Sequence, residues 1–120
     1  MKQYRRSDRL SGQILRDISE LAQNELSQGM PAMVTFTRVT LTDDLRYAKI
    51  YYSVLGSDEQ RESIARYLER ENRHIRQQIG KGLRLRHIPE LTFVFDPSIK
   101  ESIRIEKLLN DLKRDSHDSQ

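Results

Sequence analysis

Arginine and lysine side chains are the residues of this chain whose number and spacing point most directly to a chemical task. Between Arg66 and Arg86 the sequence carries seven basic residues against two acidic ones, a local charge of +5. A second basic cluster stands at the start of the chain and consists of Lys2, Arg5, Arg6 and Arg9 against Asp8. Each cluster alone is equally compatible with a solvated helix face. Together they predict a phosphate-binding surface.

Other patterns that could do chemistry are weak. His74, His87 and His117 lie too far apart in sequence to place two metal ligands on one helix face. The chain has no cysteine, which excludes thiolate metal sites and cysteine nucleophiles. Gly80-Lys81-Gly82 lacks the hydroxyl residue of a nucleotide-binding loop, and Asp43-Asp44 suits a turn. We therefore expect no enzymatic activity, no metal, no cofactor and no small-molecule substrate.

Three aromatic residues could stack on nucleic-acid bases if they lie on an uncovered sheet face. They are Tyr47, Tyr51 and Phe93. The alternative favoured by the pattern is that Phe93 packs in the core beside Leu91, while the tyrosines make ordinary cross-strand pairs.

The length of 120 residues predicts one domain, and 36% hydrophobic residues are enough for a modest core. No apolar run approaches the roughly 18 residues of a membrane span, and the basic start lacks the apolar stretch of a signal peptide. The expected location is the cytoplasm, without membrane contact. A net charge of +3 is by itself a weak argument for a polyanionic partner.

The first half of the chain predicts a helix followed by a hairpin. Apolar residues at helical spacing run from an N-cap at Ser7 to about Ser27, before Gly29 and Pro31. MVTFTRVTLT and RYAKIYYSV are typical of two strands joined by a turn at Asp43-Asp44. The apolar alternation of the first strand slips near Arg38, which predicts a bulge.

The second half begins with a capping box at Ser57 to Gln60 and a helical stretch from Asp58 to about Lys81. Its apolar line fails at Asn72, and a straight rod of this length would overshoot the sheet. We therefore predict two helices with a break within two residues of Asn72, which would place Arg73 and Arg76 at a helix N-terminus as a phosphate site. The alternative is one gently curved helix.

HIPELTFVF predicts a third strand, and a second capping box at Ser98 predicts a final helix whose apolar stripe is Ile105, Leu108, Leu109 and Leu112. The expected architecture is α+β, a three-stranded sheet with helices on one face. Residues 1–114 would form the domain and residues 115–120 a polar tail.

Several segments resemble the ribosome-binding factor A family: DDLRYAKIYYSVLG at 43–56, IRQQIGKGLRLRHIPELTFVFDPS at 75–98 and IRIEKLL at 103–109. The resemblance implies a type II KH-like fold, α-β-β-α-α-β, and a role as a non-enzymatic assembly factor. It also implies binding to 16S rRNA of the small (30S) ribosomal subunit, maturation of that RNA's ends and growth in the cold. The family's small-x-Gly kink between the central helices is replaced here by Glu71-Asn72-Arg73.

We expect the RNA-binding surface to combine eight cations, and the free protein to be a monomer. The residues are Arg5, Arg6, Arg9, Arg73, Arg76, Lys81, Arg84 and Arg86. The alternative is a protein-protein interaction module that docks through its apolar C-terminal helix.

Overall fold

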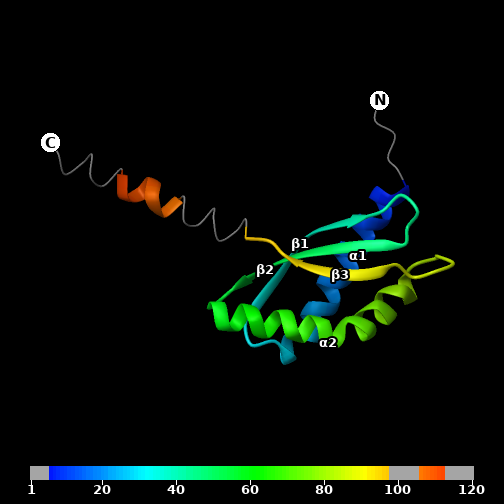
Figure 1. Ribbon diagram of the computed structural model, residues 1–120, viewed down its shortest axis with the longest axis horizontal. Coiled ribbons are helices and arrows are strands. Elements are labelled where there is room, and N and C mark those ends of the chain that lie inside the picture. The colour runs from blue at the N-terminus through cyan, green and yellow to red at the C-terminus, as the bar shows by residue number, and fades with distance from the viewer. Residues whose placement is uncertain (1–5, 98–105, 113–120) are drawn as a thin grey trace.

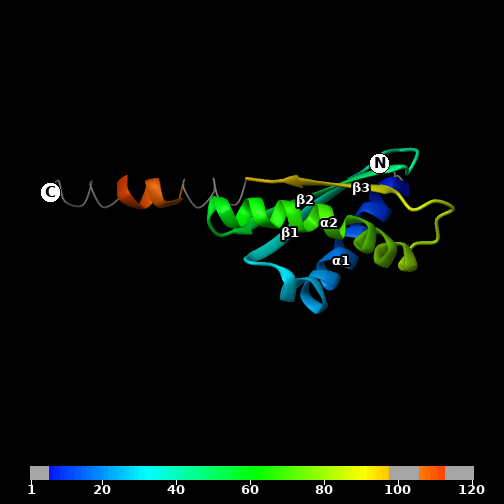
Figure 2. The ribbon, with the colours of Figure 1, turned by 60° about the horizontal axis from the view of Figure 1, so that its bottom comes forward.

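The computed structural model describes residues 6–97 and 106–112, and its element order is helix, hairpin, helix, strand. The elements are α1 (Arg6–Asn24), the short 3-10 helix η1 (Leu26–Gly29), β1 (Met33–Leu41), β2 (Tyr47–Leu55), α2 (Asp58–Gly82) and β3 (Glu90–Phe95). Residues 106–112 are also helical. The sheet order is β1-β2-β3, with β1 antiparallel and β3 parallel to β2. Figures 1 and 2 show α1 and α2 on the same face of this sheet, which confirms the predicted two-layer α+β architecture.

The β1–β2 hairpin contains the predicted bulge. Phe36 pairs with Tyr52 and Arg38 pairs with the adjacent residue, Tyr51, so Thr37 is the extra residue. Because a bulge shifts the side-chain alternation by one position, Phe36 and Val39 both reach the core while Arg38 turns to the opposite face.

The hairpin turn is held by the Asp44 carboxylate. This group accepts hydrogen bonds from the Thr42 hydroxyl at 2.6 Å and from the Arg46 backbone N–H at 3.1 Å. The Thr42 bond is the main reason that the pKa of Asp44 lies below its ordinary value. Leu45 adopts a left-handed conformation with φ of 62°. The expectation that Asp43-Asp44 forms a turn is confirmed.

α1 differs from its expected bounds at both ends. It already includes Arg6, the first described residue, so the predicted N-cap Ser7 lies within the helix, where it is buried and its carbonyl accepts a bond from the Ser11 hydroxyl at 2.7 Å. The helix ends at Asn24, and the next residues tighten into η1 before the chain reaches Pro31. The 3-10 turn satisfies helix-end carbonyls in a shorter path than a further α-turn would.

α2 is a single helix of 25 residues, so the predicted break near Asn72 is wrong. Its start is the predicted capping box: Ser57 Oγ accepts from the Gln60 N–H at 3.2 Å, and Gln60 Oε1 accepts from the Ser57 N–H at 2.9 Å. At about 1.5 Å per residue the helix is about 37 Å long. The full length is used because the second half of α2 packs on α1 as well as on β3 and the loop before it.

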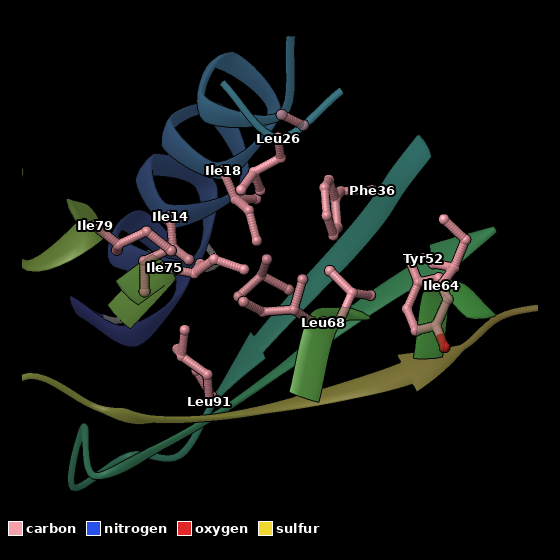
Figure 3. Close-up of a cluster of buried hydrophobic side chains, with 14 of the residues drawn as sticks. Ile14, Ile18, Leu26, Phe36, Tyr52, Ile64, Leu68, Ile75, Ile79 and Leu91 are labelled. Carbon is pink, nitrogen blue, oxygen red and sulfur yellow. The ribbon is translucent and has the colours of Figure 1, made fainter. Parts of the chain in front are cut away.

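The core shows how α2 divides its contacts between two neighbours. Ile64 and Leu68 in its first half lie under the sheet near Tyr52, and Ile75 and Ile79 in its second half lie beside Ile14 of α1 (Figure 3). These α2 residues are 0 to 2% exposed. A length comparison between helix and strand alone misses the contact with α1.

Other sequence predictions fall on residues 1–5, 98–105 and 113–120, which lie outside the described part. They concern Arg5, the Ser98 cap, Ile105 and the whole of the predicted tail, residues 115–120. In residues 106–112 the predicted leucine stripe is present but not packed: Leu108, Leu109 and Leu112 are 53 to 64% exposed.

Candidate nucleic-acid interface

One face of α2 points away from the core and is rich in cations. Arg66, Arg70, Arg73 and Lys81 are exposed and lie at intervals of four, three and eight residues. These intervals keep the four side chains on one side of a helix with 3.6 residues per turn. We call these four residues the outer face of α2. Arg66 and Arg70 were not among the predicted RNA-binding residues, although their spacing from Arg73 could have placed them there.

Arg76 lies three residues after Arg73 but faces the loop that joins α2 to β3. Its Nε donates to the Pro89 carbonyl at 3.0 Å and its Nη2 donates to the Ile88 carbonyl at 2.6 Å. The guanidinium group is therefore engaged with backbone, and the side chain is partly buried. Because α2 is continuous, Arg73 and Arg76 lie within the helix. The predicted phosphate site at a helix N-terminus is wrong.

Asn72 lies one turn before Arg76 on the same side of α2. Its Nδ2 donates to the Leu91 carbonyl of β3 at 3.0 Å. One further turn along the helix, a Cβ atom at Gly80 would lie 2.8 Å from Ile88 Cγ1. The lack of a side chain at Gly80 therefore lets the loop pack close to the helix. Asn72, Arg76 and Gly80 thus form a line, here called the loop flank of α2, that holds β3 and the preceding loop against the helix.

A second group of cations comes from two distant parts of the sequence. Arg6 and Arg9 project from the first turns of α1, and Arg84 and Arg86 from the loop after α2, and all four are exposed. Figures 1 and 2 both place the start of α1, the β1–β2 turn and this loop at one end of the molecule. The Gln13 side chain of α1 donates to the Gly82 carbonyl at 3.0 Å and ties the two segments together.

We call Arg6, Arg9, Arg84 and Arg86 the basic end. Lys81 lies in the last turn of α2, where the outer face of that helix meets the basic end. The structure thus brings six of the eight predicted cations to exposed positions: Arg6, Arg9, Arg73, Lys81, Arg84 and Arg86. Such a surface can bind phosphate oxygens by charge-assisted hydrogen bonds.

The aromatic candidates separate onto two faces of the sheet. Phe93 packs toward the core, with its ring 6.4 Å from that of Phe36, as the sequence favoured. Tyr47 is 54% exposed on the face without helices, and the Tyr51 ring on that face lies 4.1 Å from the Arg38 guanidinium. Tyr52 belongs to the core instead, where burial raises its pKa. Arg38 was not predicted as a functional residue.

Among the described residues no cluster of three or more His, Cys, Asp or Glu could hold a metal ion. His74 is paired with Glu25, the residue that follows α1, with Nε2 and Oε1 2.6 Å apart. In the same part of the chain, no helix has the length and apolar character needed to cross a membrane.

Comparison with known proteins decides the family. The ribosome-binding factor A family model matches residues 6–109. The chain belongs to the ribosome-binding factor A family. A ribosome-binding factor A from Natranaerobius thermophilus is 39% identical over 107 residues, which cover 89% of this chain and 82% of that protein.

A crystal structure and a map-fitted homology model of ribosome-binding factor A from Thermus thermophilus share the fold. The crystal structure has a TM-score of 0.62 at 23% identity and covers 73% of this chain and 93% of its own. The homology model, fitted into a cryo-EM map of a complex of the 30S subunit with the factor, has a TM-score of 0.61 at 22% identity and covers 74% of this chain and 93% of its own. The KH-like fold expected from the family resemblance is confirmed, with one continuous helix where two central helices were expected.

Proposed function

We propose that this chain binds 16S rRNA in the small (30S) ribosomal subunit and acts, without catalysis, as an assembly factor. It would promote late maturation of the subunit and processing of the rRNA ends, and it would support growth in the cold. Membership of the ribosome-binding factor A family carries this proposal. A relative with the same fold has been fitted into a map of a 30S complex, which supports the small subunit as the partner.

The contact surface would join the basic end to the outer face of α2. Exposed guanidinium groups bind phosphates without regard to sequence, so position on the RNA is set by charge and selectivity by RNA shape. The spread of these cations over α1, α2 and the loop suits a folded RNA that contacts several elements at once. Arg76 would act indirectly, because it fixes the loop that carries Arg84 and Arg86.

The first experiment measures affinity for 16S rRNA against salt concentration. With about four to six phosphates neutralised, the slope of log K against log salt should be about −3 to −4. Arg84→Glu combined with Arg86→Glu should lower the affinity several-fold or more. The matched control compares Arg86→Glu with Lys107→Glu, which changes the charge equally on the exposed segment 106–112. Salt-independent affinity, or equal effects of the two single reversals, would contradict the proposed surface.

A second experiment tests the proposed partner in cells. In gradient fractions of an extract the protein should sediment with free small subunits, because an assembly factor leaves before translation begins. Equal or greater occupancy of polysomes would count against an assembly role.

A second candidate function is protein binding through the C-terminal helix. It is favoured by the exposure of Leu108, Leu109 and Leu112, which form an apolar stripe without a covering element among the described residues. The discriminating test is retention on RNA when protein partners are absent. Retention on purified rRNA supports the RNA function, and retention that needs ribosomal proteins supports the second candidate.

A further inference from the structure

The sheet face opposite the helices carries a regular set of cationic and aromatic side chains. The strand register places six side chains on this face, because along each strand they alternate with residues that enter the core. They are Arg38 and Thr40 of β1, Tyr47, Lys49 and Tyr51 of β2, and Thr92 of β3. All but the half-buried Tyr51 are exposed. We call these six residues the open sheet face. Figure 2 shows the strands edge-on, with both labelled helices on the other side.

The bulge is the feature that puts a cation on this face. With regular alternation Phe36 and residue 38 would point to the same side, and Arg38 would enter the core. The extra residue, Thr37, reverses the phase, and its hydroxyl donates to the Asp96 carboxylate at 3.1 Å. Arg38 is thereby directed over the Tyr51 ring, 4.1 Å from its centroid. Bulges often re-aim a side chain in this way at functional positions.

The charged side chains that β1 and β2 contribute to this face are all cationic. β1 and β2 contain no Asp or Glu, and the acidic residue of β3, Glu90, lies at the end beside Tyr47. Lys49 lies between Tyr47 and Tyr51 along β2, and Arg38 lies across from Tyr51 on β1. Neither cation has an acidic neighbour in its own strand. Tyr47 and Tyr51 are four residues apart, which is about 13 Å along a strand. Such spacing gives two separate stacking positions with a cation between them.

We propose that the open sheet face binds single-stranded RNA by base stacking. One base would stack on Tyr47 and another on the Arg38–Tyr51 pair, while Lys49 contacts the intervening phosphate. An aromatic ring and a guanidinium plane both accept a base on their flat face, and sheets use this arrangement to hold unpaired nucleotides. The inference deepens the proposed function, on which the choice of RNA rests, and it adds a surface separate from the basic end and from α2.

A protein partner is the competing occupant, and the observations favour RNA. The middle of the open sheet face offers two cations, two phenol rings and threonines, and its apolar residue is the half-buried Val94 beside Tyr51. This is less than the contiguous apolar area that a protein interface core needs. The exposed apolar residues Met33 and Leu55 pair at the far end of the hairpin, away from Tyr47.

The test uses the full chain and an octanucleotide of uridines carrying one photoreactive 5-iodouridine. We expect crosslinks at Tyr47 or Tyr51. Tyr47→Leu and Tyr51→Leu should each lower affinity for the oligonucleotide about fivefold or more, since each stacked base contributes at least that much. Tyr47→Phe and Tyr51→Phe keep the ring and should bind as the original does. Tyr67→Leu, on α2, removes a tyrosine elsewhere and controls for composition.

Circular dichroism melts identify any variant that fails to fold. If a leucine variant fails to fold, Lys49→Gln, a surface change, is measured in its place. We expect it to lower the affinity for the oligonucleotide. Crosslinks on α2 or at the basic end, with unchanged affinity of the leucine variants, would overturn the stacking surface. If small-subunit binding persists in that case, the proposed function stands and this inference alone fails. Leucine variants that bind the oligonucleotide normally but lose the small subunit would identify a protein as the occupant and also overturn the proposal.

Discussion

The outer face and the loop flank of α2 run side by side along one helix, yet they use similar polar residues in opposite ways. On the outer face, Arg70 and Arg73 are exposed and lie where a ligand can reach them. On the loop flank, Arg76 and Asn72 donate to the carbonyl groups of Ile88, Pro89 and Leu91. A step of three residues turns a side chain by about 60° around the helix axis. Here that turn separates Arg73, a candidate ligand-binding group, from Arg76, a structural one.

The largest effect should come from removing the loop-flank arginine. Arg76→Ala loses two hydrogen bonds from a charged donor to partly buried carbonyls, and we expect the free energy of unfolding to fall by about 2–3 kcal/mol. Arg73→Ala should change it by no more than about 0.5 kcal/mol. Urea unfolding followed by circular dichroism measures both. Similar losses in the two variants would contradict the different roles assigned to Arg73 and Arg76.

Asn72 tests the same flank without a charge. Asn72→Ala leaves the Leu91 carbonyl without its side-chain donor, and we expect a loss of about 1 kcal/mol even though alanine favours helix. Gln77→Ala, on the exposed side of α2, is the control and should be neutral or slightly stabilising. An increase in stability for Asn72→Ala would mean that helix propensity outweighs the bond to β3.

The glycine of the loop flank can be compared with a glycine in open space. Nothing lies within 4 Å of a Cβ placed at Gly12 of α1, so Gly12→Ala should raise the free energy of unfolding by about 0.5–1 kcal/mol. Gly80→Ala gains the same helix propensity but crowds Ile88, and we expect it to give no gain or a net loss. Thermal melts of the two variants decide. Equal stabilisation would show that the loop packs more loosely against α2 than the contacts indicate.

The smallest expected effect is on the Tm of variants at Asp17, a residue of α1 whose carboxylate lies near Gly82 of α2. Burial raises the pKa of Asp17, with Glu20 adding to the rise. A raised pKa means that the ionised group destabilises the fold above its folded-state pKa and has no such effect below its ordinary value of 3.8. Asp17→Asn should therefore raise Tm slightly near pH 7, and the difference should disappear near pH 3. Asp8→Asn, in the first turn of α1, should instead lower Tm slightly near pH 7 because it removes a favourable helix-dipole interaction.

Local patterns predicted the hairpin, its bulge and the start of α2, because each depends on residues close together in sequence. The slip from Val34 and Phe36 to Val39 marks the bulge directly, and Ser57 with Gln60 marks the cap. The helix break was wrong because the partner of Asn72 is a carbonyl of β3, nineteen residues away. A polar residue in an apolar line indicates a break only when no such partner exists.

The sequence indicated which segment of the candidate site is rich in basic residues, but not which of its side chains are exposed on one surface. Counting cations between Arg66 and Arg86 identified the region, and most of its members are exposed. The role of Arg76 depends on where the loop carbonyls lie, and the position of Arg38 depends on the bulge as well as on Tyr51 across the strand pair. Both require the tertiary arrangement, which single-sequence patterns do not contain.

The parallel pairing of β2 with β3 has a consequence for the order of folding. Hairpin pairs such as Leu41 with Ala48 are close in sequence, whereas Ile50 pairs with Phe93 across the whole of α2. Contacts of large sequence separation form late, so we expect α1 and the hairpin to assemble first and β3 to join them last. The loop that carries Arg84 and Arg86 is fixed only when β3 docks. A nascent chain that has not yet finished its third strand is therefore expected to lack a complete basic end.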